Sequence, residues 1–194
     1  MDEDVIRAML KWPNVPALYG WVRLDRRGNW YIQGERVTRA ALVAFIGRNY
    51  DKDERGRWFF QNGPQRCYVE LDYTPWVLQA QPEGGLRTHT GLPVERPYQA
   101  FLDEQGSLLI YFERGLGLLA ETDLDWGMSR LQGSQGPLDE SRLASAIETL
   151  MAGEPADLVL CVGGLRLPVQ FMPSDQAPSR FGYDPKPAAG EEKQ

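Results

Sequence analysis

The sequence predicts an α+β protein built from two tandem β-β-α-β-β units, and three observations lead to this fold class. In each half of the chain, short runs that alternate apolar and polar residues flank a longer pattern with helical spacing. A turn sequence of an acid, two further residues and glycine recurs at residues 25–28, 53–56 and 103–106. The 194-residue chain is 42% hydrophobic and 25% charged, which is typical of a globular protein with a buried core.

The first unit is predicted over residues 19–80. Its helix has Leu42, Phe45 and Ile46 at the three-and-four spacing of one buried face, and Thr38 is the expected N-cap. The turn at Gly28 requires a positive φ, as a tight hairpin does. The predicted elements are strands 19–25 and 29–33, a helix at 39–49, and strands 57–61 and 66–73.

The second unit is predicted over residues 98–173 and repeats this order with additional strands. Asp139 is the expected N-cap of its helix, and Gly153 is expected to end that helix. A closing hairpin turns at residues 163–164. The predicted elements are a strand before Gly106, strands 108–112, 117–121 and 124–131, a helix from 139, and strands 158–162 and 165–171.

Three segments lie outside the two units. Residues 1–18 are expected to form a short acidic helix and then an extended stretch in which Trp12 anchors the segment on the first sheet. Residues 81–97 lose periodicity and are predicted to be a linker. Residues 174–194, rich in proline, glycine and charge, are predicted to be a disordered tail.

The net charge of −6 argues against general affinity for nucleic acid, because binding to phosphates requires a basic face. Residues 1–80 nevertheless carry twelve basic and ten acidic residues, against nine and seventeen in the rest. The arginines of this half form either a local anion site or a solvated face of mixed charge. The acidic N-terminus and the lack of a run of about eighteen apolar residues indicate a cytoplasmic protein without a membrane span.

The sequence has no motif for catalysis or metal binding, and we expect neither an enzyme nor a cofactor. It contains no Gly-x-Ser-x-Gly and no phosphate-loop pattern, and its only histidine, His89, lies in the predicted linker. Cys67 and Cys161 are expected to be buried free thiols. Glu70 and Asp72 share a strand face and could form an acid/base pair, although alternating acids are commoner on the solvated face of an edge strand.

Several motifs of the first half resemble a mostly proteobacterial family that is classed as a domain of unknown function. These are Trp30-Tyr-Ile-Gln-Gly34, Val37-Thr-Arg-Ala-Ala-Leu-Val-Ala-Phe-Ile46, Asp53-Glu-Arg-Gly-Arg-Trp58 and Val69-Glu-Leu-Asp-Tyr-Thr-Pro-Trp76. The resemblance covers roughly residues 12–172. It implies a duplicated α+β unit whose second copy resembles a partial pleckstrin-homology barrel, and a nucleotide-like ligand in the groove between the copies. It brings no catalytic residues.

Four residues are candidates for that ligand site. Trp12 and Trp76 lie in proline-bounded connections, where an aromatic ring is free to stack on a base. Arg39 at the start of the first helix and Arg66 are candidate phosphate ligands. The first hypothesis is a regulatory module that binds a small anionic or nucleotide-like ligand in signal transduction. The alternative is an adaptor whose second unit offers a sheet edge or an apolar patch to a protein partner.

Overall fold

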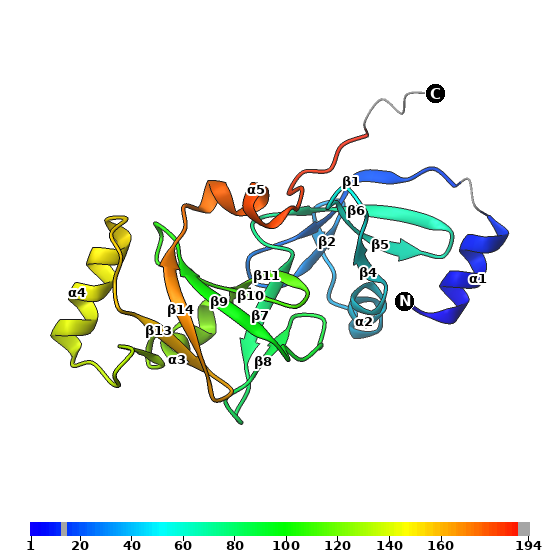
Figure 1. Cartoon of the computed structure of the whole chain (residues 1–194). Helices are drawn as coiled ribbons and strands as arrows, with labels where there is room; N and C mark the ends of the chain where they lie inside the picture. Colours follow the sequence, from blue (N-terminus) through cyan, green and yellow to red (C-terminus); the bar gives the residue numbers. More distant parts are fainter. Residues whose placement is uncertain (13–14, 190–194) are drawn as a thin grey trace. The chain divides into compact units, whose positions relative to one another are not determined.

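The computed structural model describes residues 1–12 and 15–189, which form two compact units (Figure 1). The first unit comprises residues 1–75 and 182–189, and the second comprises residues 76–181. Each unit has its own sheet, which confirms the predicted α+β class with two β-rich units. Within the described ranges, no helix is long and apolar enough to span a membrane.

The first unit is a six-stranded sheet in the order β3-β2-β1-β6-β5-β4. The two central strands, β1 and β6, pair in parallel, and all other pairs are antiparallel. The elements are α1 (Glu3–Lys11), β1 (Leu18–Leu24), β2 (Trp30–Ile32), β3 (Glu35–Arg36), α2 (Ala40–Arg48), β4 (Tyr50–Lys52), β5 (Trp58–Asn62) and β6 (Gln65–Leu71). The predicted strands and helix of this unit are therefore present, with β3 and β4 as additional short edge strands.

Helix α2 packs on one face of this sheet through its apolar residues. Phe45 meets Phe60 edge to face with ring centroids 6.4 Å apart, and Ile46 is fully buried. The predicted N-cap is wrong by one residue: Arg39 occupies that position with extended backbone and makes no side-chain cap hydrogen bond. Burial of the apolar face, and not capping, therefore stabilises this helix.

The second unit is an eight-stranded sheet, in the order β12-β13-β14-β9-β10-β11-β7-β8, that curls into a half-barrel (Figure 1). Strand β9 pairs in parallel with β14, the last strand of this unit, just as β1 pairs in parallel with β6, the last strand of the first unit. The strands are β7 (Trp76–Ala80), β8 (Leu86–Thr88), β9 (Pro97–Leu102), β10 (Leu108–Phe112), β11 (Gly115–Leu119), β12 (Leu131–Gln132), β13 (Val159–Val162) and β14 (Leu165–Phe171), and the main helix is α4 (Glu140–Met151). Asp139 caps α4 as predicted, because its side chain accepts a hydrogen bond from the backbone N–H of Arg142.

The recurring acid-x-x-glycine sequence forms the same turn three times. In each copy one aspartate Oδ1 accepts the backbone N–H groups of the residues two and four positions later, at 2.7–3.0 Å. The glycines have φ of +81°, +76° and +75°. These copies are Asp25 with Gly28 before β2, Asp53 with Gly56 before β5, and Asp103 with Gly106 before β10. The sequence repeat therefore corresponds to a structural repeat.

One predicted strand is wrong. Residues 124–131 were predicted to be a strand, but most of them form a helix. The 3-10 helix η1 (Glu121–Asp123) is followed directly by α3 (Leu124–Met128), and only Leu131 at the end of the segment belongs to β12. Gly127 lets α3 approach the sheet, since a Cβ there would lie 2.6 Å from Leu119 Cδ2 and 2.8 Å from Leu108 Cδ2. A short apolar run has no period that distinguishes a buried helix from a strand.

The predicted boundary and linker also differ from the structure. β7 belongs to the second unit because it pairs in parallel with β11, so this unit begins at Trp76 and not after residue 80. The predicted linker contains β8. His89 is half-buried and not a solvated loop residue, because its Nδ1 accepts the Val77 N–H at 3.2 Å.

Most of the predicted disordered tail is ordered. In the second unit, η2 (Ser174–Gln176) leads into α5 (Ala177–Phe181), whose Phe181 packs edge to face on Phe101 at 5.5 Å. In the first unit, Asp184 donates its N–H to the Gly56 carbonyl at 3.0 Å, and Pro185 accepts from Leu71 at 2.9 Å. Backbone pairing of this kind depends on distant partners, which composition does not reveal. Residues 190–194 lie outside the described residues.

Candidate functional site

The face of the first sheet opposite α2 carries arginine and aromatic side chains. Strand alternation places them there, because their neighbours Val22, Leu24 and Val69 are buried on the α2 side. Cross-strand pairing brings Arg23 opposite Tyr31 and Phe59 opposite Tyr68. We call this surface the arginine–aromatic face; it consists of Tyr19, Trp21, Arg23, Tyr31, Phe59, Arg66 and Tyr68, together with one acid, Glu70, which lies opposite Arg23 on β6.

Arg66 is the cation on this face that is best placed to meet an anion. Its guanidinium lies 4.1 Å from the centroid of the Phe59 ring. The side chain is half-buried, and among the described residues no acid forms an ion pair with it. Its orientation is therefore fixed by aromatic rings and its charge is not neutralised.

Trp21 presents an exposed indole on the same face. The parallel pairing of β1 with β6 shifts register between Leu18 and Val22, and Gly20 within this bulge has φ of +70°. A bulge turns a side chain outward, and Trp21 is 46% exposed. Nearby on β1, Arg23 stacks on Tyr31 at 4.2 Å and forms an ion pair with Asp72.

A polar cluster supports the aromatic rings from the edge of the sheet. Arg57 forms an ion pair with Asp53 at 2.8 Å and donates to the hydroxyls of Tyr68 at 2.9 Å and Tyr19 at 3.4 Å. The Tyr68 hydroxyl donates to Asp53 at 2.9 Å, and the Tyr19 and Tyr68 rings stack at 4.6 Å. These bonds hold the two tyrosines in one orientation.

The electrostatics of the cluster follow from burial and hydrogen bonding. Burial alone would raise the pKa of Asp53, but hydrogen bonds from the backbone and side chain of Arg57 outweigh it, and the pKa of this carboxyl lies below its usual value. Burial raises the pKa of Tyr68, which stays a neutral hydroxyl. The cluster is thus a charged Asp53–Arg57 pair beside the neutral Tyr68 hydroxyl, an arrangement that holds the rings in place.

Comparison with protein families places this chain in one of them. A family model named DUF2944 and described as "Protein of unknown function (DUF2946)" matches residues 1–188. The chain belongs to this family. The predicted membership of a family of unknown function is therefore confirmed.

Two solved structures are similar to this DUF2944 chain. A DUF1285 family protein from Silicibacter pomeroyi DSS-3 shares 19% identity with a TM-score of 0.45, over 84% of this chain and 86% of that one. A DUF1285 family protein from Shewanella baltica OS155 also shares 19% identity, with a TM-score of 0.41, over 53% of this chain and 86% of that one. Comparison with curated proteins found no match.

The four site residues predicted for this DUF2944 member have different surroundings. Arg66 lies on the arginine–aromatic face. Arg39 is exposed at the start of α2, and Trp12 is 56% exposed at the end of α1, so it does not anchor that segment on the sheet. Trp76 belongs to the second unit, where it is 3% exposed and donates its indole N–H to the Arg114 carbonyl at 2.9 Å; it is a core residue. The groove between the units stays a prediction.

Sequence reasoning missed most of the arginine–aromatic face. Trp21 is 46% exposed, whereas Trp30 and Trp58 on the other strands of the same unit are 1% and 3% exposed. The available signal was alternation, since Tyr19, Trp21 and Arg23 fall on the side of β1 opposite Val22. Asp72, one of the two possible catalytic acids, is in an ion pair with Arg23. No group of three or more potential metal ligands gathers anywhere in residues 1–12 and 15–189.

The ion pair of Asp53 should make stability depend on pH. Because its folded-state pKa is lowered, the stabilisation is present above about pH 4 and is lost as pH falls through the folded-state pKa. We expect Asp53→Asn to lose about 1–3 kcal/mol near pH 7 and to match the unchanged protein near pH 2. Urea unfolding at both pH values measures the free energy of unfolding of the variant and of the unchanged protein. Glu54→Gln, which changes an exposed acid of the same turn, is the control and should show no such difference; an equal loss at both pH values would contradict the assignment.

Proposed function

We propose that this chain is a non-enzymatic regulatory module that binds a small anionic, nucleotide-like ligand on the arginine–aromatic face. The observation that carries the proposal is Arg66, a cation held over the Phe59 ring at 4.1 Å without an acidic partner among the described residues. Its guanidinium offers paired N–H donors that match the oxygens of a phosphate. Because the side chain is already ordered, binding costs less conformational entropy.

The aromatic residues would supply the second part of such a site. A flat ring on the ligand can stack on the exposed indole of Trp21, and stacking of a base on an aromatic side chain contributes about 1–3 kcal/mol. Such stacking tolerates different bases, whereas the arginine selects for negative charge. The face would therefore favour nucleotides over nucleosides.

A thermal-shift screen against nucleotides and simple anions tests the proposal. A ligand at about a hundred times its dissociation constant stabilises the folded protein by roughly 2.7 kcal/mol, a shift of several degrees in the melting midpoint. We expect a shift with a nucleotide class, and we expect Arg66→Ala to remove most of it. Arg39→Ala removes an exposed arginine of the same unit away from this face, so it is the matched control and should retain the shift.

The outcomes separate this proposal from the alternative. A shift that survives unchanged in Arg66→Ala would contradict the site. No shift across the panel would favour the adaptor, for which the second unit offers a pair of exposed rings, Tyr98 and Tyr111, with centroids 5.5 Å apart. The edge strands β8 and β12 are too short to add a partner strand, so an adaptor would use this aromatic pair.

A further inference from the structure

Helix α1 exposes apolar side chains that nothing in the first unit covers. Ile6 is 45% exposed and Leu10 is 79% exposed, and their spacing of four residues places them on one side of the helix. Trp12 at the end of the helix is 56% exposed. Large apolar residues so exposed and so close together are typical of an interaction surface.

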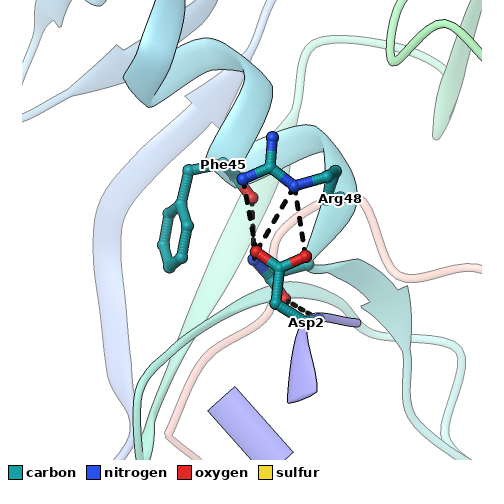
Figure 2. Close-up of polar contacts among 4 residues, drawn as sticks. Asp2, Phe45 and Arg48 are labelled. Carbon is teal, nitrogen blue, oxygen red and sulfur yellow. Dashed lines mark hydrogen bonds and ion pairs between the residues drawn. The ribbon is translucent and has the colours of Figure 1, made fainter. Parts of the chain in front are cut away.

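The orientation of α1 is fixed at its N-terminal end (Figure 2). The Asp2 carboxylate accepts from Arg48 Nε at 3.1 Å and from Asn49 Nδ2 at 3.2 Å, while the Asp2 N–H donates to Asn49 Oδ1 at 2.8 Å. Val5, one turn further, is buried and Ala8 and Met9 are half-buried, whereas Ile6 and Leu10 lie on the exposed side of the helix.

The charges of α1 are separated along its length. Glu3 and Asp4 lie in the first turn and Lys11 in the last. Asp4 is paired with Arg7 within the helix. Among the described residues, neither Glu3 nor Lys11 forms an ion pair, although Lys11 Nζ lies 5.5 Å from the Trp12 ring. The exposed apolar row is thus flanked by one free negative and one free positive charge.

We infer that this face of α1 binds α1 of a second copy of this chain, with the two helices antiparallel. A two-fold axis is the symmetry that joins identical surfaces. In the antiparallel arrangement Ile6 and Leu10 of the two copies bury one another, each Glu3 lies beside the partner copy's basic last turn, and the helix dipoles oppose. A bilayer fits less well, because an anionic surface repels the acidic first turn. This dimer is independent of ligand binding.

The dimer is expected to be weak. A helix of nine residues buries much less than the ~1,600 Å² of a standard interface, so we expect a dissociation constant on the order of 10 μM to 1 mM. Analytical ultracentrifugation of the full chain over this range should show a reversible monomer–dimer equilibrium. Leu10→Asp should leave only monomer, with an unchanged melting midpoint because Leu10 is exposed.

A charge-swap experiment tests the antiparallel pairing directly. Glu3→Lys alone and Lys11→Glu alone each place like charges opposite one another at both ends, so each should raise the dissociation constant by about threefold or more. An equimolar mixture of the two variants restores opposite charges at both ends and should associate as tightly as the unchanged protein. Each variant carries the same substitution in the mixture as it does alone. Any effect of the substitution on the stability of α1 is therefore the same in both measurements and cancels when the dissociation constants are compared. Lys52→Glu, at an exposed position on β4, is the control and should not change association.

Two results would overturn the inference. One is a protein that stays monomeric up to about 1 mM, or a mixture that associates no better than its components. The other is binding to vesicles of zwitterionic phosphatidylcholine that Leu10→Asp abolishes, with no dimer at the same protein concentration; the face would then be a membrane contact.

Discussion

Replacing Gly56 with alanine is expected to destabilise the first unit by about 2–5 kcal/mol. Gly56 has φ of +76°, a conformation that costs an L-residue about 1–2 kcal/mol. An added Cβ would also lie 2.1 Å from the Gly182 carbonyl oxygen and 3.2 Å from Tyr183 Cα. Both contacts are with backbone, which cannot move aside as a flexible side chain can, so the clash adds about 1–3 kcal/mol.

Gly34→Ala is the matched control for this prediction. Gly34 lies in the same unit with φ of +82°, and nothing lies within 4 Å of the position its Cβ would occupy. It should therefore show the backbone cost alone, about 1–2 kcal/mol. Urea unfolding followed by tryptophan fluorescence measures both variants. Equal losses would mean that residues 182–184 do not pack on the turn that contains Gly56.

Replacing Asp103 with alanine is expected to destabilise the second unit by about 2–4 kcal/mol. This side chain is fully buried, and its Oδ1 accepts the backbone N–H groups of Gln105 at 2.9 Å and Ser107 at 2.7 Å. Alanine removes this acceptor from two turn donors, at about 1 kcal/mol or more for each hydrogen bond lost to a charged group. The same urea experiment measures the loss.

Two further variants make the Asp103 prediction specific. Asp103→Asn keeps an Oδ1 acceptor in place. It should lose about 1 kcal/mol, which is the scale of a single hydrogen bond and at most half of what alanine loses. Asp25→Ala removes the equivalent carboxylate from the first unit, where the side chain is only half-buried and water can replace it, so its cost should be smaller. If asparagine and alanine are equally damaging at position 103, the hydrogen bonds of Oδ1 are not the cause.

Local features of the fold were predictable because neighbouring residues determine them. The acid-x-x-glycine turn needs only an aspartate and a glycine at fixed spacing, and all three copies form it. The helices α2 and α4 follow from apolar residues at three-and-four spacing. The strands of the first unit follow from alternation, because one face of its sheet packs against α2.

Features that depend on close approach between distant segments were not predictable. Gly127 allows α3 to pack on Leu108 and Leu119, and nothing within residues 124–131 distinguishes this helix from a strand. The ordered C-terminal segment depends on two backbone hydrogen bonds, one donated to the Gly56 carbonyl and one accepted from the Leu71 N–H, with partners more than a hundred residues earlier in the chain. Composition alone therefore misassigned both segments.

The candidate site divides in the same way. The sequence by itself determined that the first half is rich in arginine and aromatic residues, and it identified Arg66 as a candidate residue for binding an anionic ligand. Only the tertiary structure decided that Trp76 is a core residue and that Arg66 lies on Phe59. The physical reason is that propensity and periodicity act over a few residues, whereas the burial of a side chain and the neighbours of its charge are set by cross-strand register between segments far apart in the chain.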